Sequence, residues 1–192
     1  MIKRNQYLLF AGLFLVGIIS RLAPHIPNVT SVAAISLFAG AILGSRFLAI
    51  AVPVLMMFAS DLVINNTISR AFFPHIEGFV IFDSYMFWVY LGIIVTVLIG
   101  EKFLKNRNAG KLFIGSIGAT LVFWVLSNIG AWISMDLWPK NSTGLMACYA
   151  AAIPFLRNSL MGDLVFTLIL FGVYDYYLSG SKSSISFKPS KV

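Results

Sequence analysis

Charged side chains are scarce in this sequence. Only 11% of the 192 residues are Asp, Glu, Lys or Arg, whereas 59% are hydrophobic and the mean hydropathy is +0.89. A typical soluble domain contains about 25% charged residues and roughly 45–50% apolar residues. A soluble chain of this size would leave about a third of its unfolded surface in water when folded. Its interior would therefore be too small to bury so many apolar side chains. The composition therefore excludes a soluble enzyme and a disordered chain, and it predicts an integral membrane protein.

Cysteine and the common catalytic motifs are also scarce. The single cysteine, Cys148, excludes an internal disulfide, and it lies far along the chain from both histidines. The sequence contains no Walker A loop, no HExxH and no GxSxG motif. We therefore expect no cofactor, no metal site and no enzymatic activity.

In place of charge, the sequence has six apolar runs. They lie at residues 6–22, 30–44, 47–64, 84–100, 112–133 and 158–178. A helix that crosses a bilayer needs about 20 predominantly apolar residues, and shorter runs suffice when polar ends reach the interface. We predict an all-α polytopic membrane protein with six transmembrane helices. Residues 1–180 would form one domain and residues 181–192 a basic cytoplasmic tail.

The 14 basic residues are distributed unevenly among the predicted loops. If the N-terminus is cytoplasmic, ten of them lie on the inner side. The four on the outer side are Arg21, Arg70, Lys140 and Arg157. Loops rich in Lys and Arg stay in the cytoplasm. The bias predicts that both termini are cytoplasmic, and it explains the net charge of +7 without nucleic-acid binding.

The last outer loop contains an apolar segment of its own. A run from Leu145 to Phe155, interrupted by Pro154, is too short to cross a bilayer. We predict a short extra re-entrant or interfacial helix, which would either close a pocket or act as a plug with no ligand.

A few ionisable side chains fall within the predicted spans, where they are costly unless paired or hydrated. Asp61 lies near the outer end of the third span, and Arg157 and Asp163 flank the outer start of the sixth. Asn128 and Asn158 lie at a similar depth. These side chains would converge on one polar site. Alternatively, Arg157 pairs with an Asp to join helices, and Asn128 makes an interhelical hydrogen bond.

Small residues form a stripe along the second span. Ser36, Gly40 and Gly44 recur every four residues. Such spacing allows another helix to approach closely, and that helix belongs either to this chain or to another protein.

Several motifs together resemble a known family. They are the Arg21–Ala34 segment with its Pro-His-x-Pro-Asn turn, Ser60-Asp61, Ser127–Trp132, Cys148–Phe155 and Arg157–Asp163. They resemble an uncharacterised bacterial membrane family labelled as transport proteins. That family is related to the S components, the substrate-binding subunits of energy-coupling-factor vitamin transporters.

The resemblance implies six helices in the bacterial plasma (inner) membrane, both termini inside and a pocket near the outer face. It also implies a coupling transmembrane protein with ATPase subunits, for which Ser36, Gly40 and Gly44 would be the docking face. Some solitary relatives handle cobalamin through a cysteine. Cys148 lies in a different motif, which makes it a weak candidate for a metal ligand.

We therefore expect a membrane protein that captures a small, vitamin-like or other micronutrient solute from the outer face, surrounded by lipid. Arg157 would pair with an anionic group of the solute or with an Asp, and Trp132 and Tyr149 would stack on it. The expected substrate-binding residues are His25, Asn28, Asp61, Asn128, Trp132, Tyr149, Arg157, Asn158 and Asp163.

Two alternatives stay open. The first is an intramembrane enzyme that uses Asp61 and Asp163 as an acid–base pair within hydrogen-bond reach. The second is an assembly subunit that transports nothing, whose polar groups are all paired internally.

Overall fold

The structure is a computed structural model of the chain that describes residues 2–24, 26–71 and 78–178. The described elements are all helices, which confirms the predicted all-α class. They are α1 (Ile2–Leu22), α2 (Val32–Ile42), α3 (Arg46–Asn66), the 3-10 helix η1 (Ile68–Ala71), α4 (Ser84–Phe103), α5 (Ala109–Ser134) and α6 (Ser142–Leu178). The predicted tail at 181–192 and His25 lie outside the described residues.

Four helical segments are long and apolar enough to cross a membrane. They are Arg46–Ala71, Ser84–Phe103, Ala109–Ser134 and Ser142–Tyr176. Two further apolar helices, Leu8–Leu22 and Val32–Ile42, are shorter. These lengths and compositions fit a membrane protein, and the count of six spans stays a prediction.

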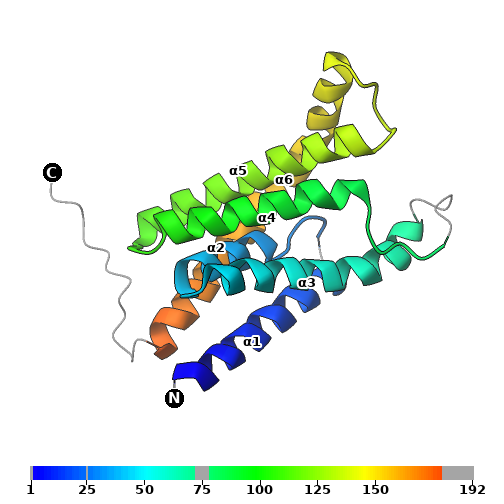
Figure 1. Cartoon of the computed structure of the whole chain (residues 1–192). Coiled ribbons are helices and arrows are strands. Elements are labelled where there is room, and N and C mark those ends of the chain that lie inside the picture. The colour runs from blue at the N-terminus through cyan, green and yellow to red at the C-terminus, as the bar shows by residue number, and fades with distance from the viewer. Residues whose placement is uncertain (1, 25, 72–77, 179–192) are drawn as a thin grey trace, which may run out of the picture.

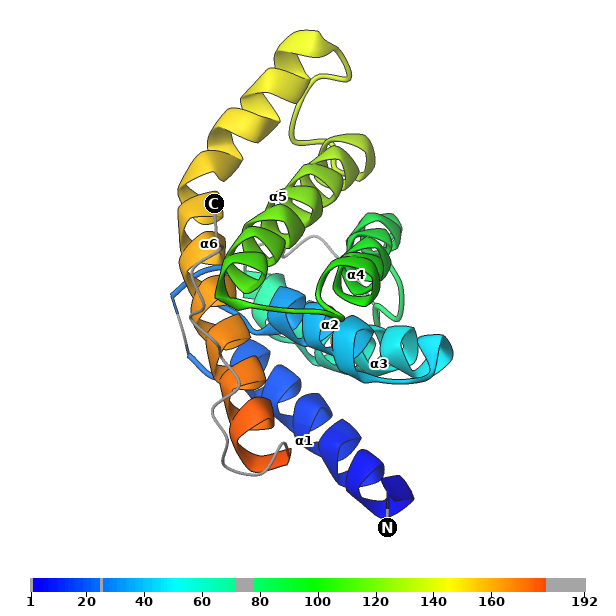
Figure 2. The ribbon, with the colours of Figure 1, turned by 90° about the vertical axis from the view of Figure 1, so that its left-hand side faces the viewer.

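The short helix α2 lies at the centre of the bundle (Figure 2). It contacts α1, α3, α4, α5 and α6, and residues 31–40 are all buried. A helix that is apolar on every side is stable only when other elements surround it. Its composition, with Ile35, Leu37 and Phe38 almost fully buried, therefore explains its central position.

The small-residue stripe of α2 meets a helix of the same chain. A Cβ atom on Gly40 would collide with the carbonyl group of Val97, and one on Gly100 would collide with that of Leu37. The α2 and α4 backbones are thus in direct contact at two glycines. Ser36 and Gly40 are buried, whereas Gly44 is exposed beyond the end of α2. Of the predicted docking face, only Gly44 is therefore on the surface.

The last helix corrects the prediction for the last outer loop. α6 is continuous from Ser142 to Leu178 with Pro154 inside it, so 145–155 is not a separate short helix. Figure 2 shows α6 as one long, bowed helix. Its first turns are held against α5 by two hydrogen bonds. Trp124 Nε1 of α5 donates to the Ala152 carbonyl (3.2 Å), and the Tyr149 hydroxyl of α6 donates to the Val125 carbonyl (2.9 Å). This support stabilises the helix across a proline that interrupts its hydrogen-bond ladder.

The two ends of the bundle differ. We call the end at which α1, α3 and α5 finish and α4 begins the cavity end, for the reason given below. The start of α1 and the end of α6 are both at the opposite end (Figure 1).

Two ion pairs join elements at the opposite end. Arg46 donates two hydrogen bonds to Glu101, at 2.9 and 2.7 Å, and ties α3 to α4. Arg107, in the turn between α4 and α5, pairs with Asp175 of α6. The Arg107 guanidinium also lies 5.3 Å from the ring centre of Phe171, which is fully buried. This end of the bundle is therefore closed by charge pairs and an aromatic side chain.

Candidate functional site

A cavity exists because α2 is short. Its 11 residues span about 16 Å, compared with about 30 Å for the 20 residues of α4. α2 packs on α4 near Val97 and Gly100, in the half of α4 farther from the cavity end. The other half of α4, with Tyr85, Met86 and Val89, lines a cavity of about 1080 Å³, which the first residues of α2, Val32 and Ala33, also border.

The cavity is bounded by the first residues of α2 and by side chains from all five other α helices. Its volume is just above the range that is usual for small-molecule sites, which runs from about 300 to 1,000 Å³. Its apolar lining includes Val32, Ala33, Met57, Met86 and Phe123. Its polar lining consists of Arg21, Asn28, Thr30, Asp61, Asn65, Ser69, Asp83, Tyr85, Ser127, Ser134, Asp136, Ser159 and Asp163.

The first polar cluster in the cavity joins α1, α3 and α4. Arg21 NH2 lies 2.5 Å from Asp61 Oδ1, and the Tyr90 hydroxyl donates to Asp61 Oδ2 at 3.1 Å. The Arg21 and Asp61 side chains are only 12% and 9% exposed. Arg21 also contacts the sulfur of Met57. Because both oxygens of Asp61 are occupied and its charge is balanced, this cluster anchors α1 to its neighbours.

The second polar cluster joins α5 and α6. Asp163 is 6% exposed, and its Oδ2 lies 2.7 Å from the Thr120 hydroxyl, which is 2.9 Å from the Ser116 carbonyl oxygen. Farther along, the Thr167 hydroxyl lies 3.4 Å from that of Ser116. Among the described residues, no basic side chain forms an ion pair with Asp163. Asp163 thus differs from Asp61, whose charge is balanced by Arg21.

The loop between α1 and α2 forms one wall of the cavity. Asn28 adopts a positive φ of 64°, a conformation that Asn tolerates better than most residues. Asn158 of α6 donates to the Pro27 carbonyl at 3.0 Å. Gly162, one turn further along α6, lies directly against Val29. Asn158 therefore positions the loop that carries Asn28, and Asn28 itself lines the cavity.

The other predicted site residues that the structure describes do not line the cavity. Asn128 donates to the Trp124 carbonyl of its own helix (2.8 Å), and Trp132 donates to that of Pro139 (2.9 Å). Arg157 is exposed on α6. Cys148 is buried, with its sulfur 3.5 Å from the Asn128 carbonyl oxygen.

Of the predicted set, the structure therefore brings Asn28, Asp61 and Asp163 together in one cavity. Asn128, Trp132, Tyr149, Arg157 and Asn158 lie outside its lining: Tyr149 binds the Val125 carbonyl, Arg157 is exposed, and Asn158 binds the α1–α2 loop at Pro27. Arg21 is the main cavity residue that sequence reasoning missed as a site residue. The available signal was a basic residue at the end of an apolar run, directly before the Pro-His-x-Pro-Asn turn.

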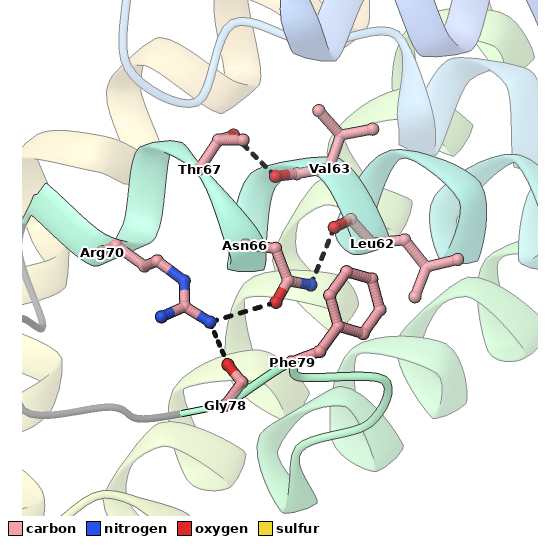
Figure 3. A pocket seen from close by; sticks show the side chains of 7 residues that line it. All are labelled: Leu62, Val63, Asn66, Thr67, Arg70, Gly78 and Phe79. Carbon is pink, nitrogen blue, oxygen red and sulfur yellow. Dashed lines mark hydrogen bonds between the residues drawn. The ribbon is translucent and has the colours of Figure 1, made fainter.

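A shallower hollow lies at the same end of the bundle, beside η1. Figure 3 shows its lining residues, Leu62, Val63, Asn66, Thr67, Arg70, Gly78 and Phe79. The Asn66 amide donates to the Val80 carbonyl and accepts from the Val80 N–H, both at 2.8 Å. Arg70 donates to Asn66 Oδ1 and to the Gly78 carbonyl. Because these polar groups bind the backbone, the hollow serves to fix the segment before α4.

The acid–base alternative depends on the two buried carboxylates in the cavity. Asp61 is bound to Arg21 and Tyr90, and Asp163 is bound to Thr120. No hydrogen bond joins Asp61 to Asp163 in the described part of the chain. The separate partners favour different roles for the two groups.

The comparisons with known proteins give one match. No curated protein and no solved structure matches the chain. A family of unknown function, DUF6580, matches residues 2–185, nearly the whole length. The chain therefore belongs to the DUF6580 family.

Proposed function

We propose that the chain is a membrane protein that captures a small solute in this cavity as part of its transport. In this proposal it lies in the bacterial plasma membrane with both termini in the cytoplasm, so that the cavity end faces outward. Its role would be similar to that of an S component, which binds the solute while a separate module supplies the energy.

The observation that carries the proposal is the cavity itself. A volume of about 1080 Å³ suits a solute of vitamin size, and the lining combines apolar surface with a few polar groups. The cavity is bounded by side chains from all six α helices, so small shifts between helices would change its shape. Toward the opposite end, the bundle centre is filled by the buried residues 32–40 of α2. A pocket that is accessible from one end and sealed at the other is the arrangement that solute capture requires.

The docking of a coupling protein is part of the proposal. Because Ser36 and Gly40 are buried, and Gly40 lies against α4, such a partner would contact another part of the surface. The exposed residues around Gly44 and Arg46 lie at the opposite end, which the proposed orientation places at the cytoplasmic face. That location suits a partner that works with cytoplasmic ATPase subunits.

The proposal is tested by identifying a solute that stays bound during purification. The full chain is purified in mild detergent and examined by native mass spectrometry for an added small-molecule mass. Ser127→Phe projects a bulky ring into the cavity, since Ser127 lines it and its hydroxyl donates to the Trp124 carbonyl of its own helix. We expect the added mass in the wild type and its loss in Ser127→Phe.

The matched control is Leu121→Phe on the same helix, because Leu121 is 40% exposed and does not line the cavity. This variant should keep the bound solute. Equal retention by Ser127→Phe and Leu121→Phe would contradict solute binding in the cavity, as would a wild type that never carries a solute after expression in rich medium.

A further inference from the structure

We propose that the solute is an organic cation, such as a protonated amine or an amidinium, and that Asp163 supplies its counter-charge. This inference rests on the proposed function and names the chemical class of its solute.

The charge around the cavity is opposite in sign to the charge of the chain. The chain has 14 basic and only 7 acidic residues. Four of those acidic residues, Asp61, Asp83, Asp136 and Asp163, line the cavity, whereas Arg21 is the one basic residue that does so in the part of the chain that the structure describes. A concave site with one sign of charge and low-dielectric walls concentrates ions of the opposite sign. The cavity is therefore built to attract cations.

Three of the four carboxylates already have a structural role or lie in solvent. Asp61 is neutralised by Arg21 at 2.5 Å. Asp83 caps α4, because its Oδ1 accepts from the Tyr85 N–H at 2.9 Å. The Asp136 side chain is fully exposed, with Lys140 Nζ 3.7 Å away. Asp163 is thus the carboxylate whose charge is both buried and unpaired among the described residues.

The geometry of Asp163 leaves one oxygen for a ligand. Oδ2 is bound to the Thr120 hydroxyl at 2.7 Å, and Oδ1 has no hydrogen-bond partner among the described residues. Among the described residues, two buried side-chain atoms have neither contact with solvent nor a hydrogen-bond partner. They are Arg21 Nε and Thr96 Oγ1. Because Asp163 Oδ1 is not one of them, it is accessible from the cavity. A buried carboxylate requires a partner to stay charged, and a cation in the cavity would provide one.

The rest of the lining favours an organic cation over a metal ion. Within the described residues, no three His, Cys, Asp or Glu side chains gather to hold a metal. Tyr85, Phe123 and Met86 instead present aromatic and thioether surface to the cavity. Aromatic faces attract ammonium and guanidinium groups, and apolar walls accommodate the carbon body that such a group carries.

The charge preference can be tested without knowing the solute. Ser127→Cys, in a Cys148→Ala background, places one thiol in the cavity about 10 Å along α5 from Thr120. The purified full chain is treated with methanethiosulfonates that carry either a trimethylammonium or a sulfonate group. We take the reaction rate of the cationic reagent divided by that of the anionic reagent. This ratio is then divided by the same ratio for Ser142→Cys, an exposed position. We expect a normalised ratio of about ten or more, because one unpaired charge at this distance changes rates by that order.

Asp163→Asn, added to Ser127→Cys, keeps the shape of the side chain and removes the charge. The normalised ratio should then fall severalfold toward one. A ratio that stays high in Asp163→Asn would show that another group attracts the cation and would overturn the role of Asp163. A ratio near one in Ser127→Cys itself, with both reagents reacting, would overturn the cationic solute but leave the cavity in place. If neither reagent reacts with Ser127→Cys, the cavity does not admit water, and the proposed function fails as well.

Discussion

Two buried aspartates in the same cavity have different surroundings. Asp61 is held by Arg21 and Tyr90, so its charge stabilises the packing of α1, α3 and α4. Asp163 is bound only to the Thr120 hydroxyl among the described residues. A charge inside a membrane bundle is costly unless it is paired, so the difference separates a structural aspartate from the one that we propose to bind a cation.

For single residues, we predict that Asp61→Leu strongly destabilises the fold. The change leaves the Arg21 guanidinium buried and unpaired, which costs about 3–5 kcal/mol of unfolding free energy. The measurement is the unfolding midpoint of the purified protein in detergent. Asp61→Leu combined with Arg21→Leu removes both charges and should recover most of the loss. A single variant as stable as the wild type would show that the pair does not hold α1 in place.

At the scale of the element, the short α2 determines where the cavity lies. Its small residues allow direct contact with α4 at Gly40 and Gly100, and its 11 residues leave the cavity end of the bundle centre unfilled. The same helix thus packs one half of the bundle and creates the space in the other half.

We predict opposite effects for two glycine-to-alanine changes. Gly40→Ala forces a Cβ atom against the Val97 carbonyl and should destabilise the fold by about 1–3 kcal/mol, as overpacking does. Gly118→Ala on α5 meets no atom within 4 Å and should stabilise by up to about 1 kcal/mol, because alanine favours helix. Thermal unfolding of both variants, measured side by side, checks the signs. A Gly40→Ala variant that matches Gly118→Ala would refute the close α2–α4 contact.

The single cysteine, Cys148, lies in the first turns of α6, which pack on α5. We therefore predict that its thiol is protected in the folded protein. Cys148 is 1% exposed, so a maleimide should not label the folded protein and should label it after unfolding in dodecyl sulfate. Ser142→Cys with Cys148→Ala moves the thiol to the exposed start of the same helix and should react at once. Rapid labelling of native Cys148 would instead indicate a segment that separates from α5.

At the scale of the whole molecule, the two ends of the bundle carry different chemistry. The opposite end is joined by the Arg46–Glu101 and Arg107–Asp175 pairs, and Arg107 also lies on the Phe171 ring. The cavity end collects the acidic residues that line the cavity. A basic chain with an acidic interior at one end suits a protein whose surface charge sets its orientation and whose cavity charge selects a solute.

The positions of the helices could be predicted from the sequence more fully than their partners. The run at 112–133 became α5 (Ala109–Ser134), and the run at 84–100 became α4 (Ser84–Phe103), because an apolar run and its capping residue are local signals. The predicted break before residue 158 was wrong, because packing on α5 carries α6 through Pro154.

Which side chains pair across helices could be determined only from the three-dimensional structure. Asp61 and Asp163 were recognised as site candidates from their cost at membrane depth, and both line the cavity. Asp61 pairs with Arg21 and not with Arg157 because of the way α1 packs on α3. No local sequence pattern encodes that packing. For the same reason, the sequence could not decide whether Gly40 meets α4 or another protein.

The proposed function requires that the bundle contain a water-filled cavity open to the outside of the membrane. It is tested most directly by labelling intact cells with a membrane-impermeant thiol reagent, with each variant in a Cys148→Ala background. We expect that Ser127→Cys, in the cavity, reacts from outside, whereas Leu121→Cys, on the exposed face of the same helix, does not. We also expect that Asn106→Cys, exposed in the turn at the opposite end, reacts only after the cells are permeabilised. Labelling of Ser127→Cys only after permeabilisation, or no faster than Leu121→Cys, would contradict the proposed function.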